Sequence, residues 1–218
     1  MIQEPRKTGT TTVGIVCNDG IILASEMRAT VAGYIASEEV EKTYEIDKHI
    51  GMTAAGAAGD ILAISRILAI ETKLYKTRNG RPIGVEGAVN LLSNILYQYK
   101  MMPFMAAIIF GGVEANGEPK LFILDPSGDI IRTKDHSAFG GSGWFSAQAV
   151  LDTCYEKGNV KDLIPLAVKA IKTAMKRDTA SGGDASIVTI TKEGFKRLDK
   201  AEVERIVEKD KQKEKKKY

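Results

Sequence analysis

The sequence predicts a single α+β domain in which two antiparallel sheets are covered by layers of helices. The first observation is the order of the segments, which runs strands, a helix pair, strands, a helix pair and strands again. The second is the composition: 218 residues, 44% of them hydrophobic and 27% charged, are enough to bury a sizeable core. The third is that no internal repeat and no linker divides the chain.

The N-terminal half is predicted to form short strands followed by two helices. A turn at Asn18-Asp19-Gly20 joins β-branched segments at 12–17 and 21–25 into a hairpin. Further short strands are expected at 33–36, 43–46 and 50–55. A long helix runs from about Asp60 to about Gly80, and a second helix follows it. The apolar faces consist of Ile61, Ile64 and Leu68 in the first helix and of Ala88, Leu92, Ile95 and Tyr99 in the second.

The C-terminal half returns to strands, which are expected at 106–111, 121–124 and 130–133 with the turns EANGEP and DPSGD between them. Two helices follow. The second of these is predicted to run from an Asp162 cap to about Lys176, with Pro165 in the first turn, where a missing N–H costs little. A strand at 186–191 and a charged helix close the chain.

Charge and cysteine content exclude several classes of protein. The net charge is +3, and residues 202–218 contribute +2 of it, because they contain seven Lys/Arg and five Asp/Glu. The remainder is close to neutral, which argues against a nucleic-acid partner. No apolar stretch is long enough to span a membrane, and the leader MIQEPRKTG lacks the apolar core of a secretion signal. We therefore expect a cytoplasmic protein, with Cys17 and Cys154 as buried thiols rather than a disulfide.

Several common catalytic sites are also excluded. The segment from Gly140 to Trp144 nearly forms a nucleophile elbow, but Trp144 stands where the last glycine is needed. His49 and His136 are the only histidines, and neither has a partner at metal-ligand spacing. The chain has no P-loop and no dinucleotide-binding glycine motif. A histidine-dependent triad, a zinc site and a cofactor are therefore not expected.

The segment KTGTTTVGIV offers a different nucleophile. A free α-amine has a pKa of about 8, so at the start of a chain it can take a proton from its own hydroxyl group. Gly9 has no side chain to shield its carbonyl group from attack by the Thr10 hydroxyl. Thr10 could therefore become a catalytic N-terminus. The alternative is that the β-branched threonines simply begin a strand.

Three other segments carry residues that would suit such a nucleophile. SEMRAT contains Glu26 and Arg28, EVEKTYEID contains Lys42, and KRDTASGGDAS contains Asp178 and Ser181. Each segment alone is a weak signal. A glutamate and a lysine commonly form a surface pair, and a Ser-Gly-Gly segment is commonly a turn.

In combination, these segments resemble a proteasome β-subunit, and the archaeal catalytic type is the most similar. The order TTTVGI, SEMRAT, EKTYEID, GMTAAGAAGD, FGGSG and KRDTASGGD carries the resemblance, which covers residues 10 to about 191. The Gly9–Thr10 junction and KRDTASGGD are its most specific parts. A related bacterial two-ring protease shares the starting threonine and the lysine but typically lacks the last segment, so it matches less well.

The resemblance implies a role for each site residue. Thr10 matches the nucleophile, Lys42 the buried lysine whose charge favours a deprotonated nucleophile, and Glu26 the acid that holds this lysine. The group around the threonine amine is matched by Ser142, Asp178 and Ser181. Gly56 matches the residue whose backbone N–H binds the oxyanion. Arg28 and Asp60 match family positions that we interpret as structural.

The family's pocket for the residue before the cut is matched by Ala29, Val40, Ala54, Ala58 and Leu62. All five are apolar, and a charged side chain there would lose hydration without gaining a partner. Cleavage is therefore expected after large apolar residues. The alternative is that these alanines pack in the core beside the first long helix.

The family also implies a fold, an assembly and a maturation step. The fold is a four-layer α/β/β/α sandwich of the N-terminal nucleophile (Ntn) hydrolase type. Residues 1–9 would be a propeptide removed by self-cleavage, 10–200 the catalytic domain and 201–218 a charged helix and tail. The implied partners are sister β-subunits in a heptameric ring, a ring of α-subunits, an ATPase regulator that docks on it, and unfolded polypeptide substrates. The competing hypothesis is a structural β-type subunit that never matures.

Overall fold

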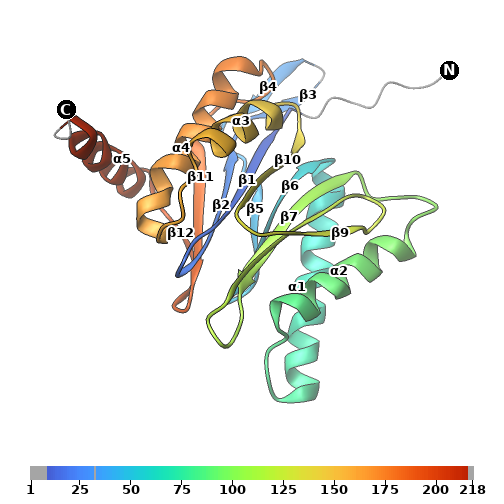
Figure 1. Cartoon of the computed structure of the whole chain (residues 1–218). Helices are drawn as coiled ribbons and strands as arrows, with labels where there is room; N and C mark the ends of the chain where they lie inside the picture. Colours follow the sequence, from blue (N-terminus) through green and yellow to red (C-terminus); the bar gives the residue numbers. More distant parts are fainter. Residues whose placement is uncertain (1–8, 32, 216–218) are drawn as a thin grey trace.

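Two five-stranded antiparallel sheets pack face to face, and helices cover both outer faces (Figure 1). The computed structural model describes residues 9–31 and 33–215. From one side of the molecule to the other, the layers are helices, sheet, sheet and helices. The α+β class and the four-layer α/β/β/α arrangement expected from the sequence are therefore confirmed.

The first sheet contains the N-terminal hairpin and has the strand order β10-β1-β2-β11-β12. Its strands are β10 (His136–Gly141), β1 (Thr11–Val16), β2 (Gly20–Glu26), β11 (Ala185–Thr191) and β12 (Gly194–Arg197). β1 and β2 form the predicted hairpin, in which Val16 pairs with Ile21 and the Cys17 N–H donates to the Gly20 carbonyl at 2.8 Å. β10 and β11 flank this hairpin, so β1 and β2 lie inside the sheet.

The second sheet is a meander in the order β5-β6-β7-β8-β9. Its strands are β5 (Thr43–Asp47), β6 (Ile50–Gly56), β7 (Ala106–Val113), β8 (Pro119–Leu124) and β9 (Ile130–Thr133). A separate two-stranded sheet of β3 (Ala29–Val31) and β4 (Tyr34–Ser37) lies between the two large sheets in sequence. It connects the end of β2 to the start of β5.

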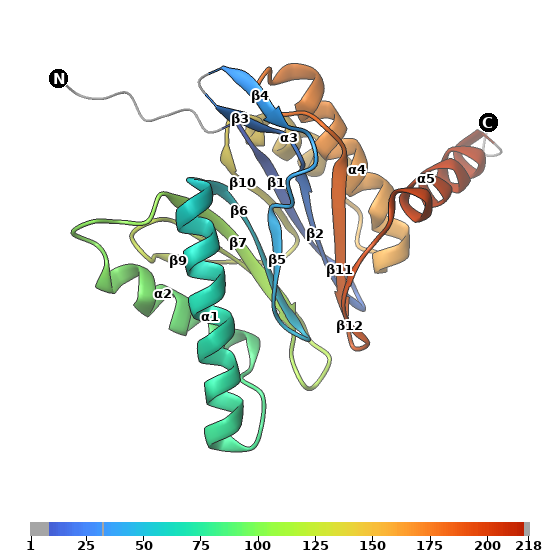
Figure 2. The same ribbon diagram turned by 180° about the vertical axis from the view of Figure 1, so that it is seen from behind.

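Each large sheet is covered by one helix pair. The helices are α1 (Ala58–Asn79), α2 (Val85–Gln98), α3 (Trp144–Cys154), α4 (Val160–Arg177) and α5 (Lys200–Lys215). α3 and α4 lie on the first sheet, whereas α1 and α2 lie on the second, which is seen best from behind (Figure 2). α1 is capped as predicted by Gly80, whose φ of 67° is left-handed and whose N–H donates to the Lys76 carbonyl at 2.9 Å.

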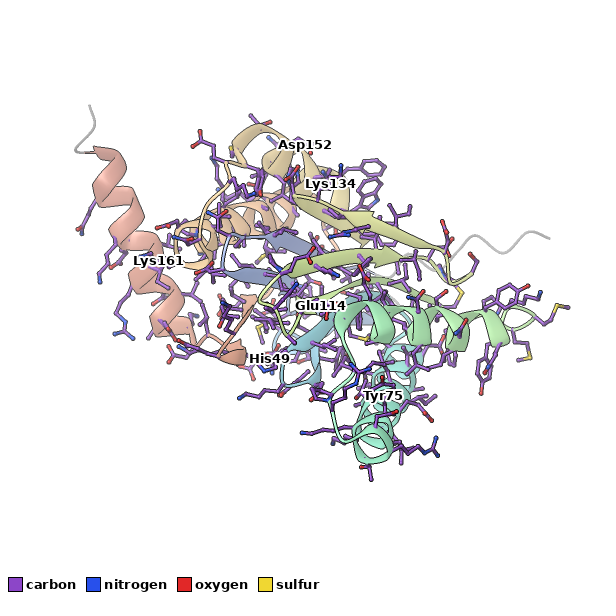
Figure 3. All side chains as sticks on the ribbon, turned by 60° about the horizontal axis from the view of Figure 1, so that its bottom comes forward. His49, Tyr75, Glu114, Lys134, Asp152 and Lys161 are labelled. Carbon is purple, nitrogen blue, oxygen red and sulfur yellow. The ribbon has the colours of Figure 1, made fainter. Side chains whose placement is uncertain are left out.

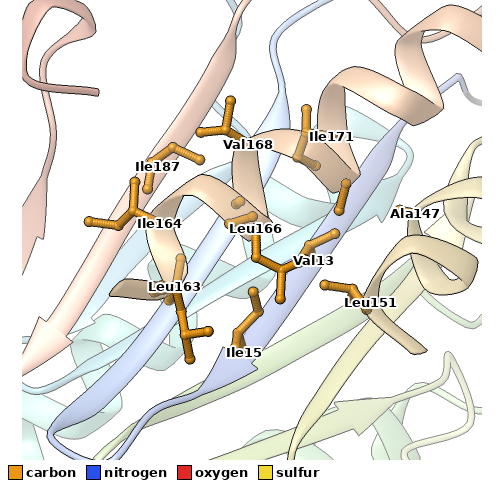
Figure 4. Close-up of a cluster of buried hydrophobic side chains, with 14 of the residues drawn as sticks. Val13, Ile15, Ala147, Leu151, Leu163, Ile164, Leu166, Val168, Ile171 and Ile187 are labelled. Atoms are coloured by element: carbon orange, nitrogen blue, oxygen red, sulfur yellow. The ribbon is translucent and has the colours of Figure 1, made fainter. Parts of the chain in front are cut away.

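Three apolar clusters hold the layers together. One lies between the first sheet and helices α3 and α4, where Val13 and Ile15 of β1 meet Leu151 and Ile171 (Figure 4). A second lies between the other sheet and helices α1 and α2. A third joins the two sheets, and it contains Leu23 of the first sheet together with Ile109 and Leu121 of the second. Because the inner strands are buried on both faces, their apolar residues form runs, such as Ile21 to Ala24 in β2, rather than alternating with polar residues. A fully buried Val, Leu or Ile side chain contributes roughly 1.5–3 kcal/mol.

Several local predictions were wrong. β3, β10 and β12 were not predicted. α4 begins at Val160 after Asn159, whose carbonyl accepts the N–H groups of Asp162 and Leu163. Asp162 is therefore a first-turn acid rather than the cap, and Pro165 lies beyond the first turn.

Two side-chain predictions were also wrong. Tyr99 lies at the end of α2 and is exposed, because α2 stops at Gln98 and its buried face ends at Leu96. Both cysteines are free, but only Cys17 is buried and Cys154 is exposed. Burial raises the pKa of the Cys17 thiol.

Only parts of the predicted propeptide and of the predicted C-terminal segment lie within the described residues. Residues 1–8 of the predicted propeptide and residues 216–218 of the predicted tail lie outside the described residues. The charged C-terminal helix is α5, which begins at Lys200 and packs Val203, Ile206 and Val207 against the cluster around α4.

Candidate active site

Thr10 directly precedes β1, where neighbouring segments hold the backbone from both sides. Its side chain is 5% exposed. The Gly143 N–H donates to the Thr10 carbonyl at 3.3 Å, and Thr11 pairs with Gly141 of β10. Gly141 has a φ of +79°, and a Cβ atom there would lie 2.0 Å from the Thr10 carbonyl oxygen. A glycine is therefore needed for β10 to approach Thr10 this closely.

The Thr10 hydroxyl group lies against the peptide group that precedes it. It donates a hydrogen bond to the Gly9 carbonyl oxygen. Gly9 in turn packs on the loop after α4, because a Cβ atom on Gly9 would lie 2.3 Å from the Ala180 Cβ atom. The predicted nucleophile and the predicted cleavage point are thus adjacent in the uncut chain.

Lys42 brings its ammonium group to the same hydroxyl group. Its Nζ atom is 3.3 Å from Thr10 Oγ1 and 2.6 Å from the Arg28 carbonyl oxygen, and it also donates to the Glu26 carboxylate. A lysine ammonium has three N–H donors, and here each has an acceptor. The backbone of Lys42 is fixed as well, since its carbonyl accepts the Thr53 hydroxyl group at 2.9 Å.

The pKa of Lys42 is below the ordinary lysine value. Burial is the main cause, and the negative charges of Glu26 and Asp178 oppose the shift. A lysine with a lowered pKa exchanges its proton more readily near neutral pH than an exposed lysine does. Lys42 can therefore supply positive charge beside Thr10 and can also take part in proton transfer.

Glu26 is fully buried at the end of β2 and is held at both carboxylate oxygens. One oxygen pairs with Lys42. The other accepts the backbone N–H of Arg28 at 2.8 Å and that of Gly182 at 3.1 Å. A buried carboxylate with an ionic partner and two N–H donors has its desolvation largely compensated. Glu26 therefore fixes the position of Lys42.

Asp178, Ser142 and Ser181 form a second cluster beside Thr10. Asp178 follows α4, and its Oδ2 atom accepts both serine hydroxyl groups at 2.5 Å. Ser181 continues the network to Thr11, with the two hydroxyl oxygens 2.9 Å apart. The cluster thus reaches Thr11, the residue next to Thr10, and its role around the threonine amine stays a prediction.

Gly56 ends β6 on the second sheet, which meets the first sheet close to this point. It pairs with Ala106 and has a φ of +151°, and a Cβ atom there would lie 1.9 Å from the Met105 carbonyl oxygen. Gly140 of β10 packs against the same end of β6, since its Cβ would lie 3.2 Å from that of Ala55. The role of the Gly56 N–H as an oxyanion donor stays a prediction.

The five predicted pocket residues do not all have the same environment. Ala54 is buried in the core beside α1, where its N–H donates to the Lys42 carbonyl at 3.2 Å. Ala29 and Val40 are partly exposed, whereas Ala58 and Leu62 are exposed on the first turns of α1. Ala54 therefore packs in the core beside the first long helix, which is the alternative given for these alanines. The assignment of the five residues to a substrate pocket stays a prediction.

A groove of about 500 Å³ borders the second cluster. Arg28, Asp178, Ser181 and Gly182 contribute to its lining. None of the five predicted pocket residues lines this groove. The groove opens the Asp178 side of the cluster to the surface.

The histidines belong to other parts of the molecule. His136 pairs with Asp152 of α3 at 2.9 Å, whereas His49 lies in the turn between β5 and β6. The positions of Asp152 and His49 in Figure 3 are well separated.

Among the described residues, no three His, Cys, Asp or Glu side chains are grouped so that they could hold a metal ion. Within residues 9–31 and 33–215, no helix is long and apolar enough to span a bilayer.

Four contributions to the site were not predicted from the sequence. They are the Thr11 hydroxyl group, the Arg28 N–H and carbonyl groups and the Gly182 N–H group. Three of them are backbone groups, which nearly any residue provides, so the sequence carries no signal for them. The Thr11 side chain could have been found, since a buried polar side chain next to a nucleophile requires a partner.

Comparison with known proteins assigns the chain to a family. The family described as "Proteasome subunit" matches residues 6–190. The chain belongs to the proteasome subunit family. Its fold is accordingly of the Ntn-hydrolase type, and the resemblance derived from the motifs is confirmed.

Archaeal proteins of this family, each named proteasome subunit beta, are similar over nearly their whole length. The protein of Methanohalophilus mahii is 46% identical over 210 residues, which cover 95% of this chain and 99% of the relative. That of Methanocaldococcus vulcanius is 45% identical over 210 residues, covering 96% and 94%. That of Methanosarcina mazei is 46% identical over 196 residues, covering 89% and 92%.

Proposed function

We propose that this proteasome family member is a threonine endopeptidase with Thr10 as its nucleophile. The observation that supports the proposal most directly is the position of the Thr10 hydroxyl group. It lies against the Gly9 carbonyl group on one side and 3.3 Å from the Lys42 ammonium group on the other. A hydroxyl nucleophile, a cationic neighbour and a target carbonyl group are the elements of nucleophilic catalysis.

The proposed first reaction is removal of the leader. Thr10 Oγ1 attacks the Gly9 carbonyl carbon and gives up its proton, the peptide nitrogen of Thr10 takes up a proton and leaves as an amine, and an ester joins Gly9 to the Thr10 oxygen. Water then hydrolyses the ester, which releases residues 1–9 and restores the hydroxyl group. The Lys42 ammonium favours loss of the hydroxyl proton through its positive charge.

The freed amine changes the chemistry of the site. With a pKa of about 8 it can accept the proton of the Thr10 hydroxyl group when a substrate peptide is attacked. Asp178, Ser142 and Ser181 would then orient the ammonium group that forms, since Asp178 accepts both hydroxyl groups. Gly56 N–H would stabilise the oxyanion, an interaction typically worth about 2.7–4 kcal/mol of barrier.

The proposed setting is a proteasome core particle. Relatives that are 45–46% identical over nearly the whole chain carry the name proteasome subunit beta. We propose that this chain joins sister β-subunits in a seven-membered ring next to a ring of α-subunits. An ATPase regulator on the α-ring would deliver unfolded polypeptides, and the location would be the cytoplasm, with no nucleic acid or membrane involved.

The test combines the N-terminus of the assembled particle with substitution of Thr10. Intact mass and N-terminal sequencing should give a chain that begins at Thr10. Thr10→Ala should abolish self-cleavage and peptide hydrolysis in a folded subunit, whereas Thr10→Ser should retain measurable activity because the hydroxyl and amine groups remain. Thr12→Ala is the matched control, since the Thr12 hydroxyl group donates instead to the Phe139 carbonyl at 2.6 Å.

Two outcomes would contradict the proposal. A fully active particle that retains residues 1–9 would exclude the free amine as base. An assembled wild-type particle that neither matures nor cleaves peptides would favour the alternative, a non-catalytic structural subunit of the ring.

A further inference from the structure

The turn between β6 and α1 is fastened to the segment that enters β7. The Ala57 N–H donates to the Met105 carbonyl at 2.7 Å, and Gly56 pairs with Ala106 in the sheet. The Met105 carbonyl oxygen also lies where a side chain on Gly56 would begin. The position of Met105 therefore determines where the backbone of Gly56 can lie.

Asp60 holds Met105 from the other side. Its Oδ2 atom accepts the Met105 N–H at 2.8 Å, across 45 positions of sequence. Both backbone polar groups of Met105 are thus bonded to the segment 57–60, one through Ala57 and one through Asp60. Because the Met105 side chain is 52% exposed, few packing contacts replace this pair of hydrogen bonds.

A general helix role does not explain this contact. Asp60 is the third residue of α1, where a carboxylate stabilises the helix dipole. Asp162 is the third residue of α4 and has the same favourable position. Asp60 differs because its carboxylate binds the backbone of a different segment, next to the glycine that is expected to bind the oxyanion.

We propose that Asp60 is a positioning residue that holds Gly56 for the reaction through Met105. This inference rests on the proposed function and extends it. The sequence indicates only a structural role for Asp60, and the proposed mechanism does not use it. An oxyanion donor is effective only when it is fixed in advance at the developing charge, and a displacement of about 1 Å can cost up to a hundredfold in rate. Loss of the Asp60 carboxylate should therefore affect kcat more than KM.

The test compares Asp60→Ala, Asp60→Asn and Asp162→Ala in assembled particles. Peptide hydrolysis is measured as kcat and KM for a leucine-ending fluorogenic peptide, and hydrogen exchange is followed for peptides that contain Met105. Asp60→Ala should lower kcat by about tenfold with little change in KM and should speed exchange at Met105. Asp60→Asn should recover most of the loss, because its amide oxygen can accept the same N–H. Asp162→Ala loses only the helix-dipole interaction and should leave both measurements unchanged.

Each contrary outcome has a distinct meaning. If wild-type particles are active and Asp60→Ala is equally active, Asp60 has no positioning role. If Asp60→Asn is as impaired as Asp60→Ala, or Asp162→Ala is impaired to the same degree, the effect does not come from the Met105 hydrogen bond. If wild-type particles are inactive, the proposed function fails, and the catalytic role of Asp60 fails with it.

Discussion

Lys42 Nζ and Thr10 Oγ1 lie 3.3 Å apart in a chain whose leader is still attached. Glu26 and the Arg28 carbonyl group hold the ammonium group at this point. On the proposed mechanism, the lysine is therefore in place before self-cleavage, and self-cleavage and substrate cleavage would use the same ammonium group.

Substitution of Lys42 should be nearly as damaging as substitution of Thr10. Lys42→Ala removes the positive charge beside the hydroxyl group and leaves Glu26 buried without its ionic partner. We expect self-cleavage and kcat to fall by about a hundredfold or more, as measured by intact mass and peptide hydrolysis of assembled particles. Lys73→Ala, on the exposed side of α1, is the control. Near-normal turnover of Lys42→Ala with unchanged assembly would exclude the electrostatic role.

The alkaline limit of activity should depend on Glu26. Burial lowers the pKa of Lys42, and Glu26 opposes this shift by stabilising the ammonium form. Glu26→Gln removes the opposing charge, so the pKa of Lys42 falls further and the ammonium group is lost at a lower pH. The alkaline limb of the kcat/KM profile should therefore move to lower pH. Glu45→Gln, exposed on β5, should leave the profile where it is. A limb that stays in place or moves to higher pH in Glu26→Gln contradicts the assignment.

Maturation should be slower without a glycine at position 9. A Cβ atom there would lie 2.3 Å from the Ala180 Cβ atom and 2.4 Å from its carbonyl oxygen, so in Gly9→Ala either residue 9 or the loop at Ala180 must shift, which disturbs the approach of the hydroxyl group to the peptide group. We expect self-cleavage to slow by about tenfold or more, followed as the fraction of precursor over time. Gly59→Ala in the first turn of α1 has open space and should mature normally. Equal maturation rates for Gly9→Ala and wild type would show that the contact with Ala180 is not needed.

Cleavage should be faster after leucine, phenylalanine or tyrosine than after arginine or glutamate. The predicted pocket residues are apolar, so a large apolar side chain would gain roughly 1.5–3 kcal/mol of burial there, whereas a charged one would lose hydration. The measurement is kcat/KM for fluorogenic peptides that differ only in the residue before the cut. Equal or higher values for arginine or glutamate would remove the pocket assignment without affecting the threonine chemistry.

The sequence predicts the chemical groups of the site better than the segments that hold them. Gly9, Thr10, Glu26, Lys42 and Asp178 all stand in short motifs, and the structure brings Thr10, Glu26 and Lys42 into direct contact. β10 was missed because HSAFGG combines small residues with little β-branched character, and β12 because four residues carry too short a pattern.

Contacts between distant segments could not be read from local patterns either. Thr11 and Ser181 are separated by 170 positions, and their hydrogen bond depends on how α4 returns the chain to β1. The Asp60–Met105 contact likewise joins a helix start to a loop after the following helix. A sequence motif shows that a carboxylate is present, but the fold decides which N–H group it meets.

The position of β1 between β2 and β10, with β11 beyond β2, also has a consequence for the time at which activity can begin. The proposed nucleophile, Thr10, is made by the ribosome well before Asp178, Ser181 and Gly182, which follow it by more than 160 positions. A nascent chain that still lacks residues 178–182 has neither the second cluster nor the N–H group that helps to hold Glu26. On the proposed mechanism, the order of translation thus keeps a partly synthesised chain inert, and the protease is switched on only when almost the whole domain has emerged and closed around Thr10.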